Sequence, residues 1–145
     1  MAKVKPVPDG YHAVTPYLII PQAAKLIDFL KTAFDAKEVE RHAGPEGVIM
    51  HAELKIHDSI IMMGEAQGQW KPMPSMLCLY VTDADAVYKR AVEAGATSLE
   101  EPSNKFYGDR SAMIKDPSGN IWAIATHIED VSPEEMRRRA QASGH

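Results

Sequence analysis

The chain has 145 residues, enough for one domain with a sizeable core, and its composition is 45% hydrophobic and 25% charged, as in ordinary globular proteins. A formal net charge of -4 argues against nucleic acid and anionic membranes as partners. The single cysteine, Cys78, cannot form an internal disulfide, which suits a reducing compartment. No apolar run reaches the ~20 residues of a membrane helix. The sequence therefore predicts a cytoplasmic protein.

The first half of the chain predicts a strand, a helix and three more strands. Aromatic and β-branched residues indicate a strand from His12 to Ile20. After Pro21, apolar residues recur at three- and four-residue steps, which indicates an amphipathic helix. The remaining predicted strands are Lys37–His42 and a hairpin of Val48–Ile56 and Ser59–Met63.

The second half predicts the same order after a Gly- and Pro-containing linker. A strand from Met76 to Val81 leads to Asp83, a good helix N-cap, and Gly95 stands where that helix should end. Further strands are expected near Leu99, at Ser111–Ile114 and at Ile121–Thr126. Ser132-Pro133-Glu134-Glu135 is a capping box that predicts a last helix.

The two halves repeat each other. TPYLIIPQAAKLIDFLKTAFDAKEVE, from Thr15, matches MLCLYVTDADAVYKRAVEAGATSLEE, from Met76. The prediction is a single α+β domain, 1–145, of two βαβββ modules related by an internal pseudo-twofold, with mixed sheets forming a concave cup. Module one spans about 11–64, a linker 65–75, module two about 76–127 and the C-terminal helix about 133–142.

The segments TPYLII, IDFLKTAF, HAELKIHDSIIMM and FYGDRSAMIKDPSGNIWAIATHIEDVSPEEMRRR resemble the vicinal oxygen chelate superfamily, which groups glyoxalase I, bleomycin-resistance proteins and extradiol dioxygenases. They are most similar to its PhnB-like branch. The resemblance covers nearly the whole chain after Gly10. It implies the two-module fold, and it implies that any metal would be held by His or Glu on the first and last strand of each module.

Those implied ligand positions fall on Thr15 and Met76 in the first strands and on Met62 and Ala123 in the last strands. Both pairs are 61 positions apart, which supports the alignment. None of the four is a His or a carboxylate, and a one-residue slip to Pro16, Met63, Leu77 and Ile124 does not restore the set. We therefore expect no metal and no cofactor at these positions.

A relocated polar site is the alternative. His51 and Glu53 are two apart on one strand and share a face, and His12 or His127 could join them. We favour the simpler interpretation, in which His51 and Glu53 line the polar face of an outer strand opposite Met50, Ala52 and Leu54. Arg110 could likewise bind an anionic group or pair locally, and His127 is expected to anchor the terminal segment.

Strand alternation predicts the lining of the cup. The expected ligand-binding residues are Thr15, Tyr17, Met50, Met62, Met76, Ser111, Met113 and Ala123. Flexible methionines build adaptable apolar pockets, but they could equally plug a vestigial cavity. Trp70 could cover the cup or dock the linker, and Cys78 is expected to be a small buried hydrophobe.

These patterns favour the binding of a small, partly apolar molecule without metal catalysis. One alternative is a divergent lyase, isomerase or dioxygenase in which His51, Glu53 and Arg110 act on a substrate. Another is a structural dimer with a filled cup. The family resemblance and the open strand edges predict a homodimer, with exchange of modules between chains left open.

Overall fold

The structure is a computed structural model that describes residues 3–144. It divides into two compact units, one holding the chain up to Ser75 with Pro117–Gly119, the other Met76–Asp116 with the chain from Asn120 onward. Within the described residues, no helix is both long and apolar enough to cross a bilayer.

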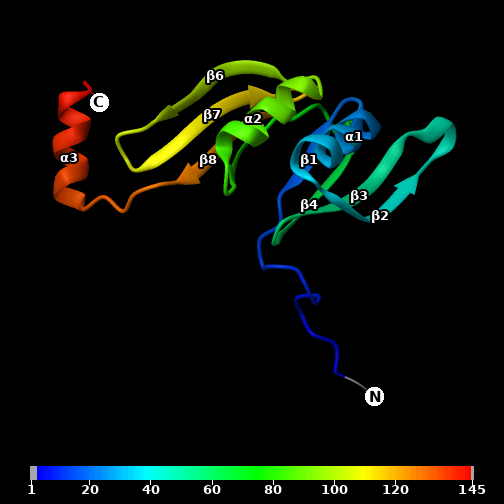
Figure 1. Cartoon of the computed structure of the whole chain (residues 1–145). Helices are drawn as coiled ribbons and strands as arrows, with labels where there is room; N and C mark the ends of the chain where they lie inside the picture. Colours follow the sequence, from blue (N-terminus) through cyan, green and yellow to red (C-terminus); the bar gives the residue numbers. More distant parts are fainter. Residues whose placement is uncertain (1–2, 145) are drawn as a thin grey trace. The chain divides into compact units, whose positions relative to one another are not determined.

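Module one is a four-stranded sheet with one helix (Figure 1). Strands β1 and β4 are parallel and the other pairs are antiparallel, in the order β1-β4-β3-β2. A short 3-10 turn, Pro45–Gly47, precedes β3. The elements are β1 (Tyr17–Ile20), α1 (Ala23–Phe34), β2 (Lys37–Ala43), β3 (Ile49–Ile56) and β4 (Ser59–Glu65).

The core of module one lies between α1 and one face of the sheet. Leu18, Ala52 and Met63 are neighbours across three strands and have at most 1% of their surface exposed. The apolar face of α1, which includes Leu26 and Leu30, is equally buried. Burial of such side chains contributes about 1.5–3 kcal/mol each, so this layer fixes which sheet face is left for function.

Module two repeats this arrangement, with strand order β5-β8-β7-β6 and β5 parallel to β8. Its elements are β5 (Met76–Tyr80), α2 (Ala84–Glu93), β6 (Thr97–Asn104), β7 (Asp109–Lys115) and β8 (Ile121–His127), followed by α3 (Pro133–Ala142). Tyr17 pairs with Met62 in module one, and Cys78 pairs with Ala123 in module two. The 61-residue repeat is therefore confirmed in the strand register itself.

The predicted helix caps are confirmed. The Asp83 carboxylate accepts a hydrogen bond from the amide of Ala86 at 3.1 Å, and the Ser132 hydroxyl accepts one from the amide of Glu135 at 3.2 Å. One strand boundary was wrong. The first strand begins at Tyr17 rather than His12, because Pro16 has no amide hydrogen to continue the ladder.

Candidate functional site

The open face of sheet one carries more polar residues than the sequence suggested. Met62 lies opposite Glu53 of β3 and beside Tyr17 of β1, and Glu53 in turn lies opposite Glu40 of β2. Residues paired across strands share a face. Tyr17, Glu40, Glu53 and Met62 therefore all face away from α1.

Ala52, expected on the same side of its strand as the predicted cup residue Met50, would by that interpretation share the face of Met62, and this register corrects it. The two-residue turn at His57-Asp58 pairs Ile56 with Ser59, and counting back from that pair sets Ala52 opposite Met63. A one-residue change of register moves every side chain to the other face. Ala52 accordingly lies in the core under α1.

A pocket of about 550 Å³ lies in the first unit. Most of its wall is aromatic or aliphatic. It is lined by Tyr17, Ile19, Met50, Gly64, Glu65, Gln67, Trp70 and Met73. Two of these, Tyr17 and Met50, are among the predicted ligand-binding residues, although whether they bind a ligand stays a prediction.

The floor of the pocket depends on Gly64. A Cβ atom there would lie 2.9 Å from the carbonyl oxygen of Met50 and 3.2 Å from the Tyr17 hydroxyl. Glycine thus leaves room for the tyrosine ring. The neighbouring Glu65 caps α1, since its two carboxylate oxygens accept hydrogen bonds from the amides of Gln22 and Ala23, each at 2.9 Å.

The linker forms another wall. The Met73 amide donates to the carbonyl of Ile19 at 2.8 Å, which holds the linker against the edge of β1. Gln67 and Trp70 exchange backbone hydrogen bonds, and Trp70 keeps 57% of its surface exposed. Sequence reasoning missed Ile19, Gln67 and Met73 because no periodic pattern marks the return of a linker to a strand edge.

A polar cluster adjoins the pocket through Tyr17. Nε2 of His51 lies 2.7 Å from Oε2 of Glu53, and Nδ1 of the same ring lies 2.9 Å from the Tyr17 hydroxyl. The hydroxyl of Tyr11 donates a short hydrogen bond to Oε1 of Glu53. That bond, together with His51, holds the pKa of Glu53 below its ordinary value despite burial.

This cluster corrects the interpretation of His51 and Glu53 as polar residues of an outer strand. β3 lies inside the sheet, and Glu53 is only 7% exposed. As expected, both side chains point to the sheet face away from Leu54. That face is the one that carries Tyr17. Sequence reasoning missed Tyr11 and Glu40. The alternation of Glu40 with His42, two residues apart like His51 and Glu53, was the available signal.

In module two all four predicted ligand-binding residues lie on one face of the sheet, and whether they bind a ligand stays a prediction. Met113 lies opposite Ala123, and Ser111 lies opposite Ala125 on the same face. Met76 begins β5 on this face and is 61% exposed.

Two further predictions for this module concern the burial of Cys78 and the position of Arg110. Cys78 is exposed rather than buried. It lies on β5, an edge strand, on the sheet face that no helix of this module covers. Arg110 lies on the other face, where its guanidinium binds the Asp85 carboxylate at 2.6 and 2.9 Å. Thr15, in the first unit, precedes β1 and is half-buried.

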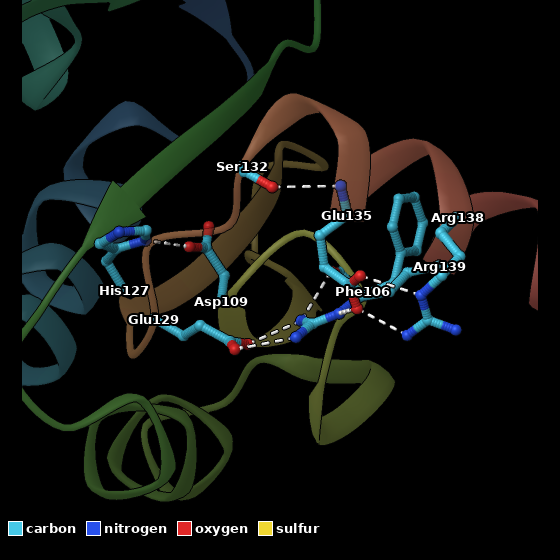
Figure 2. A network of polar contacts seen from close by, with 8 residues as sticks. All are labelled: Phe106, Asp109, His127, Glu129, Ser132, Glu135, Arg138 and Arg139. Atoms are coloured by element: carbon cyan, nitrogen blue, oxygen red, sulfur yellow. Dashed lines mark hydrogen bonds and ion pairs between the residues drawn. The ribbon is translucent and has the colours of Figure 1, made fainter.

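A second polar network surrounds Asp109, which is 5% exposed (Figure 2). Its carboxylate accepts a hydrogen bond from the Tyr80 hydroxyl at 2.7 Å and lies 2.8 Å from Nδ1 of His127, whose Nε2 lies 2.8 Å from Asp130. The bond to Asp109 raises the pKa of Tyr80 to about 12. The bond between His127 and Asp130 agrees with the expected anchoring of the terminal segment.

Comparison with known proteins gives one family. The sequence model of the Glyoxalase/Bleomycin resistance protein/Dioxygenase superfamily matches residues 11–124. An uncharacterized protein of Mycobacterium bovis is 34% identical over 143 residues, covering 91% of this chain and 94% of that protein.

Solved structures show the same fold at low identity. TioX from Micromonospora sp. ML1 is 20% identical, with a TM-score of 0.66, over 80% of this chain and 100% of that chain. A PhnB protein from Bacillus cereus is 15% identical, with a TM-score of 0.61, over 79% and 99%. At these identities the likeness supports the fold alone.

Proposed function

The chain belongs to the glyoxalase/bleomycin resistance protein/dioxygenase superfamily, and on this premise we propose that it binds a small, partly apolar molecule in the module-one pocket. The main support for this proposal is the pocket itself. Its volume of about 550 Å³ falls in the range of about 300–1,000 Å³ that small-molecule sites occupy. Its apolar wall with a few polar groups is typical of such sites.

The metal that the family resemblance implies does not fit the residues at the implied positions. Thr15 and Met62 in module one offer a hydroxyl and a thioether, and Met76 and Ala123 in module two offer a thioether and a methyl group. Divalent catalytic cations prefer imidazole, carboxylate or thiolate ligands. The proposed binding therefore uses no metal at those four positions.

The lining indicates what kind of molecule the pocket would take. Trp70 and Tyr17 offer aromatic surfaces, while Met50 and Met73 supply polarizable, adaptable side chains. The Glu65 carboxylate is already engaged by the amides at the start of α1. The Gln67 amide, which donates to Sδ of Met50, and the Tyr17 hydroxyl, which contacts His51, have further hydrogen-bonding capacity, so we expect an uncharged, planar ligand.

Tryptophan fluorescence tests this proposal. The chain has two tryptophans, and Trp122 is buried at 2% exposure whereas Trp70 lines the pocket. We would titrate the purified chain with a panel of neutral bicyclic aromatic compounds. A binding compound should change the emission of Trp70 and raise the melting temperature, because it binds only the native state.

Two variants make the test specific. Trp70→Ala should weaken binding at least tenfold, while Tyr107→Ala, which removes an exposed aromatic residue from module two, should leave it unchanged. Equal effects of both variants, or no saturable binding by any compound, would reject the pocket as the site.

The alternatives to ligand binding are an enzymatic activity and a filled cup. A lyase, isomerase or dioxygenase activity needs a reactive centre, and the polar cluster around His51 is the place to look for it. A filled cup is less favoured, since Met50 and Met76 are more than half exposed. The homodimer and the cytoplasmic location stay predictions, and light scattering of the purified chain tests the dimer.

A further inference from the structure

Three potential metal-ligating atoms converge on the open face of sheet one. They are Nε2 of His51, Oε2 of Glu53 and Oε1 of Glu40, and such ligand atoms of the three residues all lie within 4.8 Å of one another. Nε2 of His51 is 2.7 Å from Oε2 of Glu53 and 3.7 Å from Oε1 of Glu40. That spacing matches a set of ligands gathered around one small cation.

The strand pairing explains why these groups meet. Glu40 lies opposite Glu53, and His42 lies opposite His51, so two alternate pairs of β2 and β3 place two imidazoles and two carboxylates on one face. Nε2 of His42 lies 3.2 Å from Oε1 of Glu40. His42 is thus a fourth candidate ligand next to the first three.

Two tyrosines support the ligands from behind. The Tyr17 hydroxyl at Nδ1 of His51 fixes the ring and leaves Nε2 directed at Glu53. The Tyr11 hydroxyl occupies Oε1 of Glu53, so the other oxygen remains for a cation. Metal-binding histidines and carboxylates are commonly oriented by such outer hydrogen bonds.

Charge also favours a cation. Two carboxylates approach one imidazole, and one of them, Glu53, is only 7% exposed. Buried charges need partners of opposite sign. Glu40 and His42 have 45% and 68% of their side chains exposed, so an ion can reach the cluster from solvent.

We propose that His51, Glu53 and Glu40, with His42 as a fourth ligand, bind one divalent transition-metal ion on the face of module one. Nitrogen and carboxylate ligands together suit Zn²⁺, Co²⁺ or Ni²⁺ and disfavour Ca²⁺, which takes oxygen ligands. This site lies on the second and third strands of the module, and none of its ligands is at a position that the family resemblance implies, although Glu53 is the cross-strand neighbour of Met62. The proposal does not depend on any ligand of the pocket.

The test uses the full chain, stripped with a chelator and then titrated with Co²⁺ and Zn²⁺. Visible absorption reports Co²⁺ coordination, and calorimetry gives the Zn²⁺ affinity and stoichiometry. We expect one ion per chain. His51→Asn should weaken Zn²⁺ binding by at least a hundredfold, because it removes a direct ligand rather than an outer partner, whose loss costs about 10–100-fold.

Matched variants control for general effects. His57→Asn removes another imidazole, at a left-handed turn position that asparagine tolerates, and should leave affinity unchanged. Glu40→Gln should weaken binding at least tenfold, while Glu101→Gln, an exposed position in module two, should not. Because Glu40 is itself exposed, its variant remains informative even where a substitution of Glu53 prevents folding.

Several results would overturn the proposal. One is the absence of stoichiometric Co²⁺ or Zn²⁺ binding. Another is unchanged affinity in both His51→Asn and Glu40→Gln. Equal losses in the site variants and the control variants would place the ion elsewhere.

Discussion

The Tyr17 hydroxyl lies 2.9 Å from Nδ1 of His51, while the same tyrosine forms part of the pocket wall. One residue therefore joins the apolar pocket to the polar cluster on the face of module one. Burial, and then the nearby Glu53 carboxylate, raises the pKa of this phenol. Tyr17 accordingly keeps its proton and its capacity for hydrogen bonding at neutral pH.

Tyr17→Phe should separate the two roles. The ring remains, so we expect aromatic compounds to bind the pocket within about threefold of wild type, since only one exposed hydrogen bond is lost. Zn²⁺ affinity should fall by about 10–100-fold, as it does when an outer partner of a ligating histidine is removed. Calorimetry on the variant and on the control Tyr107→Phe measures both, and an unchanged Zn²⁺ affinity would deny Tyr17 its positioning role.

Gly108→Ala should severely destabilise the second unit. Gly108 has a φ of 98°, and a Cβ atom there would lie 2.3 Å from the carbonyl oxygen of Glu129. That backbone cannot move freely, because the amides of Ile128 and Glu129 both donate to the Gly108 carbonyl. We expect a loss of about 3 kcal/mol or more in the free energy of unfolding by urea.

Gly95→Ala is the matched control for this substitution. Gly95 also has a positive φ, 113°, but nothing lies within 4 Å of its Cβ position. Gly95→Ala should lower the free energy of unfolding by only the cost of a left-handed backbone at a residue with a Cβ atom, about 1–2 kcal/mol. Similar losses at Gly95 and Gly108 would mean that the loop near Glu129 adjusts and that the close contact is harmless.

Much of this fold follows from the sequence, because strand and helix periods and the 61-residue repeat are local signals. The register of β7 with β8 was also predictable, and Met113 faces Ala123 as expected. The face of Glu53 was assigned wrongly, although the predicted hairpin of Val48–Ile56 and Ser59–Met63 leaves the same two-residue turn and so implies the observed pairing of Glu53 with Met62.

The pocket was harder to predict than the sheets. Its wall includes Trp70 and Met73, which come from a linker without any periodic pattern. The polar cluster needs Tyr11, far from His51 in sequence and outside every strand. Contacts of this kind depend on tertiary packing, which propensity and spacing do not encode.

Arg139→Lys should loosen α3. No residue of this helix is buried, so its attachment depends on polar contacts. Arg139 binds both carboxylate oxygens of Glu129, at 2.7 and 2.9 Å, and also contacts Glu135 and the carbonyl of Phe106 (Figure 2). Lysine cannot reproduce a two-pronged contact.

Hydrogen exchange measures this effect. Amides of 133–142 should exchange faster in Arg139→Lys, while the free energy of global unfolding changes by less than about 1 kcal/mol, as for other exposed ion pairs. Arg137→Lys, on an exposed position of the same helix, should exchange like wild type. Unchanged protection in Arg139→Lys would show that other contacts hold α3.

His127 should make the stability of the second unit depend on pH. Its hydrogen bonds to Asp109 and then Asp130 raise its pKa above the ordinary 6.5. A raised folded-state pKa stabilises the fold fully below the unfolded value, and that contribution is lost as pH rises through the folded value. The stability difference between wild type and His127→Gln should therefore shrink as pH rises from about 6 to about 9.

Proton NMR of His127 provides the direct measurement. Asp130→Asn should lower the pKa of His127 toward its ordinary value while keeping the bond to Asp109. A pKa at or below 6.5 in wild type would contradict the prediction.

The last prediction compares two adjacent methionines that lie on opposite faces of β4. Met63 is fully buried under α1, whereas Met62 is half-buried on the open face beside Tyr17 and opposite Glu53. Met63→Ala should cost about 2–5 kcal/mol, since it leaves a cavity in a packed core. Met62→Ala should cost well below that, because solvent already reaches the side chain and little packing is lost. Urea denaturation of the two variants gives both values under identical conditions. A loss at Met62 as large as the loss at Met63 would show that Met62 is packed as core and is not a half-buried residue of the open face.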